Sequence, residues 1–91
     1  MNTIIVDDEA IMLRSFTGIA DEIPELKIEG AFRKPEEALQ YAQHHRVDLA
    51  ILDISMPGML GTQLAVKLRE IRPDMLIVFL TAYENYIQEY N

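Results

Sequence analysis

Four polar side chains stand directly after three apolar runs of the sequence, and their types could support metal and phosphate chemistry. They are Asp7, Asp8, Asp53 and Thr81. Burying a lone carboxylate at the end of an apolar run is costly. A sequence that keeps Asp53 straight in front of a Met-Pro-Gly turn is therefore expected to use its charge.

Carboxylates that are brought together repel one another, and a cation can offset that repulsion. The chain has no cysteine and no histidine near these acids, so oxygen ligands predict Mg²⁺ or Mn²⁺. Such an ion can also bind a phosphoryl oxygen. An aspartate can be the nucleophile, while the Thr81 hydroxyl and the amides after Asp53 hold the other phosphoryl oxygens. Pro57 and Gly58 are expected to shape the loop that turns these amides inward.

Alternating strands and helices are expected to position these side chains. Apolar runs at 3–6, 47–52 and 75–80 are typical of strands, and the alternating stretch 26–31 predicts an edge strand with one wetter face. Helical spacing of apolar residues predicts helices over 10–21 and 61–71, and Pro35 marks another that begins near Lys34. A fourth helix is expected from Glu84 onward. The apolar faces of the first and third helices are expected to contain Ile11, Leu13, Phe16, Ile19 and Ala20, and Leu64, Ala65, Leu68 and Ile71 respectively.

The order βαβαβαβα predicts an α/β fold, a doubly wound parallel sheet with helices on both faces. In such sheets the functional residues gather at the carboxyl ends of the strands. The four polar residues named above therefore should meet at one edge of the sheet.

Composition narrows the function classes. The 91 residues predict one domain, 1–91, and the net charge of −7 argues against direct contact with nucleic acid, which usually needs a basic face. No apolar run approaches the roughly 20 residues of a membrane helix. The absence of cysteine and of a signal peptide predicts a cytoplasmic protein.

Three motifs in this order resemble the receiver domain of bacterial two-component response regulators. They are Ile5-Val6-Asp7-Asp8-Glu9, Leu52-Asp53-Ile54-Ser55-Met56-Pro57-Gly58 and Phe79-Leu80-Thr81-Ala82-Tyr83. The resemblance covers essentially the whole chain, and it implies a flavodoxin-like sheet with strand order 2-1-3-4. It also implies a phosphoacceptor rather than a conventional turnover enzyme, although one that assists its own phosphorylation and dephosphorylation.

The resemblance implies a role for each matching residue. Asp53 would accept a phosphoryl group from a histidine kinase, and Thr81 would be the switch hydroxyl. Asp8, Asp53 and the carbonyl of Ser55 would bind Mg²⁺ directly, and Asp7 would act largely through water. The phosphoryl oxygens would be held by the backbone amides of Ile54, Ser55 and Ala82.

The family's fifth strand, with its lysine, and fifth helix have no counterpart in these residues. We therefore expect a fragment of a receiver, in which the strand ending at Thr81 is an exposed apolar edge open to self-association. The output domain would belong to a longer protein. The sequence of residues 79–86 is similar to the matching segment in receivers of LytTR- or SARP-type transcriptional regulators.

Two other functions stay open at this point. A Mg²⁺-dependent phosphatase of the haloacid dehalogenase type also uses an aspartate nucleophile, but it carries a second acid two residues later, where this chain has Ser55. A pseudo-receiver would make protein contacts only. The intact acid pair and acceptor oppose that reading.

Overall fold

Seven elements alternate along the chain in the computed structural model, which describes residues 1–80. The strands are β1 (Asn2–Val6), β2 (Lys27–Phe32), β3 (Leu49–Asp53) and β4 (Leu76–Leu80). The helices are α1 (Ala10–Asp21), α2 (Pro35–His44) and α3 (Gly61–Ile71). The bounds predicted for α1 and α3 are confirmed, and the predicted strand bounds shift by one or two residues. The expected helix after Glu84 lies outside the described residues.

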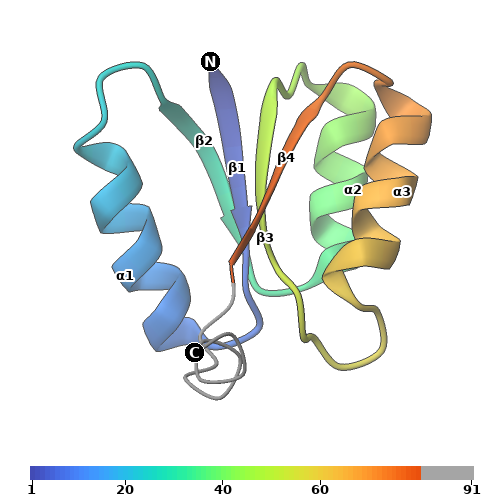
Figure 1. The fold of residues 1–91 in the computed structure, drawn as a ribbon, viewed down its shortest axis with the longest axis horizontal. Coiled ribbons are helices and arrows are strands. Elements are labelled where there is room, and N and C mark those ends of the chain that lie inside the picture. The colour runs from blue at the N-terminus through green and yellow to red at the C-terminus, as the bar shows by residue number, and fades with distance from the viewer. Residues whose placement is uncertain (81–91) are drawn as a thin grey trace, which may run out of the picture.

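The four strands form one parallel sheet in the order β2-β1-β3-β4, as predicted. Helix α1 covers one face of the sheet, and α2 and α3 lie side by side on the other (Figure 1). The sheet thus separates two apolar cores. β1 supplies both, because its side chains alternate: Ile4 and Val6 pack toward α2 and α3, whereas Ile5 packs toward α1.

The apolar faces of the helices are only partly as the sequence predicts. Leu13 and Ala20 are buried in α1, but Ile11 and Ile19 are exposed, at 77% and 60%. Ile11 precedes Leu13 by two residues, which places it about 200° around the helix and away from the sheet. In α3, Ile71 is 37% exposed at the last turn, whereas its three other predicted core residues are buried.

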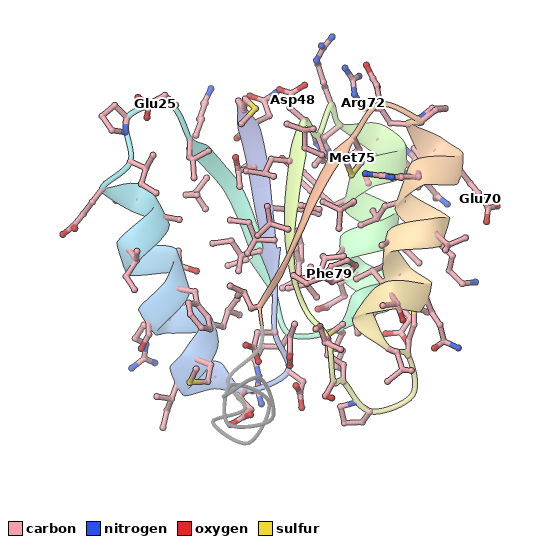
Figure 2. The ribbon with its side chains drawn as sticks, in the orientation of Figure 1. Glu25, Asp48, Glu70, Arg72, Met75 and Phe79 are labelled. Carbon is pink, nitrogen blue, oxygen red and sulfur yellow. The ribbon has the colours of Figure 1, made fainter. Side chains whose placement is uncertain are left out.

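Strand β4 forms one edge of the described sheet and β2 the other, as expected. Three apolar side chains of β4 are substantially exposed, namely Leu76, Val78 and Phe79. Figure 2 shows Phe79 on this strand. The prediction of an exposed apolar edge at β4 is confirmed for the described part of the chain.

The amino ends of the strands are joined by Asp48, the one acid within the apolar run 47–52. Its Oδ2 accepts the backbone amide of Asn2 at 2.9 Å, and its Oδ1 lies 3.0 Å from Arg46 Nε and 3.6 Å from Arg72. These contacts lower the pKa of Asp48, the amide of Asn2 most. Figure 2 shows Asp48 and Arg72 near the chain's N-terminus, at the end of the sheet opposite to the carboxyl ends of the strands.

Candidate functional site

Three carboxylates meet at the carboxyl edge of the sheet. Asp7 and Asp8 follow β1, and Asp53 is the last residue of β3. One oxygen from each lies within 4.8 Å of the others. Asp7 is only 3% exposed, whereas Asp8 and Asp53 are partly exposed. The predicted meeting of these three acids is therefore confirmed.

Asp7 is held in place by its backbone and its side chain. Its amide donates to the carbonyl of Phe32 at the end of β2, at 3.0 Å, and its Oδ1 accepts the amide of Glu9 at 2.9 Å. The second bond forms a turn that leads into α1. The structure places Glu9 at the N-cap of that helix without a side-chain capping bond, so the acids here shape the turn and do not cap α1 directly.

The loop after Asp53 is fixed by three residues whose sizes matter. The side chain of Met56 is buried in the core between the sheet and the helices α2 and α3, and this packing holds the loop against the core. Gly58 has φ of +80°, a conformation that L side chains rarely adopt. At Gly61 a Cβ would collide with the backbone carbonyl of Asp53. Gly61 begins the predicted helix 61–71, but its close approach to Asp53 depends on how α3 packs against the end of β3.

The amides that follow Asp53 have partners in this structure. The amide of Ser55 donates to Asp53 Oδ1 at 3.2 Å, so it already points at the carboxylate. The amide of Ile54 instead donates to the carbonyl of Leu80 at 3.3 Å and so links the end of β3 to the end of β4. Thr81 and Ala82, the other residues expected to contact a phosphoryl group, lie outside the described residues.

The environment of Asp53 raises the pKa of its carboxyl to about 6. Burial is the largest cause, the charge of Asp7 comes next, and Asp8 adds to both, while the Ser55 amide acts in the opposite direction. Within the described residues, no salt bridge involves any of the three acids. Among residues 1–80, the negative charge of the site is therefore not paired with a basic side chain in a salt bridge.

A hollow of about 750 Å³ opens beside the acids, and its lining includes Asp8, Met56 and Pro57 as well as Arg33, Lys34 and the first turn of α2. Arg33 follows β2 directly, and its Nε donates to the backbone carbonyl of Asp8 at 3.2 Å. No local sequence pattern marks Arg33, because its contact with Asp8 depends on the pairing of β2 with β1.

The residues present suit a hard divalent cation. Three carboxylate oxygens within 4.8 Å of one another match the oxygen-only ligands that Mg²⁺ takes. Burial first, and then the charge of Asp7, raise the pKa of Asp53, and a bound cation would favour its ionised form. The described cluster contains neither His44 nor His45, and His45 stacks on Tyr41 of α2 with ring centroids 4.0 Å apart.

The fold and site define a parallel α/β domain with an acidic cluster at the carboxyl edge of its sheet, and comparison with known proteins identifies its family. The model of the response regulator receiver domain matches residues 3–90. The chain belongs to this family.

Curated relatives agree with this assignment. The transcriptional regulatory protein YpdB of Escherichia coli K12 is 33% identical over 89 residues, which are 98% of this chain and 36% of YpdB. Protein MrkE of Klebsiella pneumoniae is 30% identical over 89 residues, 98% of this chain and 33% of MrkE. The chain thus spans about a third of the length of these relatives.

Solved structures share the fold. The isolated receiver domain of RcsB from Salmonella enterica serovar Typhimurium, in the presence of the phosphomimetic BeF₃⁻, has a TM-score of 0.81 at 27% identity, covering 93% of this chain and 64% of that one. The response regulatory domain of K. pneumoniae mrkE has a TM-score of 0.80 at 30% identity, covering 98% and 73%. No described helix is long and apolar enough to cross a membrane.

Proposed function

We propose that Asp53 of this receiver domain accepts a phosphoryl group from a histidine kinase, with Mg²⁺ bound beside it, and that the modified domain controls the output of a longer protein. The observation that carries the proposal is the position of Asp53. It ends a central strand within 4.8 Å of Asp7 and Asp8, in a chain that belongs to the receiver family.

Asp53 would act as the nucleophile. A carboxylate oxygen attacks phosphorus, the bond from phosphorus to the donor's imidazole nitrogen breaks, and the phosphoryl group remains on Asp53 as an acyl phosphate. With a pKa near 6, the carboxyl is mostly ionised at neutral pH and is more basic than an ordinary aspartate.

Asp8, Asp53 and the Ser55 carbonyl would hold the Mg²⁺, with Asp7 acting through water. The family resemblance implies this division, and the burial of Asp7 supports it, since one of its oxygens already accepts the Glu9 amide. When bound, Mg²⁺ would neutralise charge as the phosphoryl group is transferred.

Backbone amides and the Thr81 hydroxyl would hold the transferred group. The Ser55 amide already donates to Asp53, and the amide of Ala82 is proposed alongside it. The Ile54 amide would have to exchange its bond to the Leu80 carbonyl for a phosphoryl oxygen. That exchange would alter the end of β4, directly before Thr81, and offers a route from the modified Asp53 to the switch hydroxyl.

The output is proposed to be transcription, through a covalently linked domain. The relatives YpdB and RcsB support this, the first by its name as a transcriptional regulatory protein and the second by a structure bound to the promoter rprA. A LytTR- or SARP-type output and a cytoplasmic location are part of the same proposal. With a net charge of −7, this domain would not touch nucleic acid directly, but the exposed edge of β4 could pair with a second copy.

The proposal is tested by incubating the chain with Mg²⁺ and acetyl phosphate and recording its intact mass. We expect a gain of one phosphoryl group that EDTA or Asp53→Asn abolishes. Circular dichroism of both chains controls for folding. A folded wild-type chain that gains no mass, or an equal gain in Asp53→Asn, would contradict the proposal. Release of p-nitrophenol from p-nitrophenyl phosphate over many turnovers would instead indicate a phosphatase.

A further inference from the structure

The hollow beside the acidic site has a basic rim that the acceptor chemistry described above does not use. Arg33 and Lys34 are the basic residues among its described lining, and both side chains are exposed. Neither forms a salt bridge with any residue of 1–80. Two positive charges that have no acidic partner among residues 1–80 therefore border a space that Asp8 also lines.

Arg33 has one fixed contact, and it is to backbone. Its Nε donates to the carbonyl of Asp8, which lies in the turn between β1 and α1. The bond anchors the guanidinium beside the acidic site, while its two terminal nitrogens make no hydrogen bond within the described residues. A guanidinium held in this way presents a planar set of donors suited to phosphate oxygens.

The negative charges around the hollow explain why basic side chains are needed to attract a phosphodonor. Its lining also carries Asp8, Glu36 and Glu37, and Asp7 and Asp53 lie close to Asp8. A phosphodonor is itself an anion, so it approaches a wall of carboxylates. Apart from a metal ion on the acids, Arg33 and Lys34 supply the attraction that an incoming phosphate meets along this described rim.

We infer that the hollow is a subsite for the phosphorylated donor, in which Arg33, aided by Lys34, binds phosphate oxygens and positions the group next to Asp53. The ligand class is a small phosphate ester or anhydride, with acetyl phosphate as the simplest example. A volume of about 750 Å³ is ample for such a molecule. The inference rests on the proposed function, in that Asp53 receives the group.

An alternative role for Arg33 is purely structural, since it could simply hold the Asp8 turn. The two roles predict opposite effects on Mg²⁺. Removing a cation next to a cation site strengthens Mg²⁺ binding, whereas loosening the turn that carries a metal ligand weakens it. Removing the same cation weakens the binding of a phosphate. A donor-binding role therefore predicts opposite changes for the two ligands.

The test compares Arg33→Gln, Arg33→Lys and the wild-type chain. Lys67→Gln serves as the matched control, because it removes one positive charge from an exposed position in the middle of α3. Calorimetry gives the Mg²⁺ affinity, and amide NMR shifts in saturating Mg²⁺ give the affinity for inorganic phosphate. Neither measurement needs phosphoryl transfer, so both test the binding role of Arg33 even if Asp53 proves not to be an acceptor.

We expect Arg33→Gln to bind Mg²⁺ about twofold to fivefold more tightly and phosphate about threefold to tenfold more weakly, as one screened charge at contact distance would do. Arg33→Lys should restore much of the phosphate affinity, and Lys67→Gln should match the wild type. With acetyl phosphate, Arg33→Gln should raise the half-saturating concentration, and Arg33→Lys should restore much of the loss. Weaker Mg²⁺ binding in Arg33→Gln, or phosphate affinity equal to that of Lys67→Gln, would overturn the inference.

Discussion

Replacing Asp53 with asparagine should stabilise the metal-free domain, even though it removes the proposed acceptor. The amide is close to the carboxylate in size but carries no charge. In the absence of Mg²⁺ the ionised Asp53 lies partly buried and close to the acids Asp7 and Asp8. Asparagine removes that repulsion and the cost of burying the charge.

The size of the effect follows from the pKa. The Asp53 carboxyl titrates near 6 in the folded chain against 3.8 in an unperturbed one. At about 1.4 kcal/mol per pKa unit, this difference gives an upper limit of roughly 3 kcal/mol for the stabilisation. Solvent screening at a partly exposed site reduces the expected stabilisation to about 1 to 1.5 kcal/mol. For a domain of this size the unfolding midpoint should rise by about 4 to 10 °C.

The gain in unfolding free energy from Asp53→Asn should depend on pH in a defined direction. A carboxyl whose pKa is raised by folding favours the folded state below its unfolded pKa, and that contribution is lost as pH rises through the folded value. The advantage of Asp53→Asn should therefore be absent near pH 4, grow between pH 4 and 6, and be complete above about pH 7.

Urea unfolding followed by circular dichroism in EDTA at several pH values measures this directly. Asp48→Asn is the matched control. The lowered pKa of Asp48 means that its charge stabilises the fold above the unfolded pKa, so its loss should destabilise the chain at neutral pH and matter less as pH falls. A chain that Asp53→Asn destabilises at neutral pH in EDTA would refute the electrostatic description of the site.

Three further outcomes are expected. Mg²⁺ at about 100 times its dissociation constant should raise the unfolding free energy of the wild type by about 2.7 kcal/mol and that of Asp53→Asn much less. An equal rise in unfolding free energy for the two chains would show that Asp53 is not a Mg²⁺ ligand. Gly61→Ala should lower the free energy of urea unfolding by about 1 to 3 kcal/mol, because its Cβ meets the Asp53 carbonyl. Gly18→Ala lies inside α1 with open space around it and should raise that free energy by about 0.5 to 1 kcal/mol. The reverse order would contradict the packing described at Gly61. Val78→Lys on the exposed β4 edge should reduce any concentration-dependent association seen by sedimentation, and association that is unchanged would exclude that edge as the contact.

The strands, helices and acidic cluster could be predicted because they depend on local patterns. Continuous apolar runs, helical spacing and acids at the ends of strands are all properties of neighbouring residues. Parallel topology then brings strand ends to one edge without further information, which is why the meeting of Asp7, Asp8 and Asp53 followed from the sequence.

The features that were not predicted depend on contacts between distant segments. Arg33 reaches the Asp8 carbonyl only because β2 pairs with β1, and Gly61 matters only because α3 starts against the end of β3. Asp48 interrupts the apolar run 47–52 in the sequence, and its side chain joins the amino ends of β1 and β3 in the structure. The predicted apolar face of α1 is wrong at Ile11 and Ile19, because apolar character alone does not determine which side of a helix is buried.

The central claim is that Asp53, among three neighbouring acids, carries the phosphoryl group. Substitution alone cannot distinguish an acceptor from a metal ligand, because Asp53 is proposed to be both. Borohydride reduces an acyl phosphate to an alcohol, so treating the chain after incubation with Mg²⁺ and acetyl phosphate converts the modified aspartate to homoserine. Tandem mass spectrometry of the digested chain should find homoserine at position 53 only. Homoserine at position 7 or 8, or at none of the three, would contradict the account.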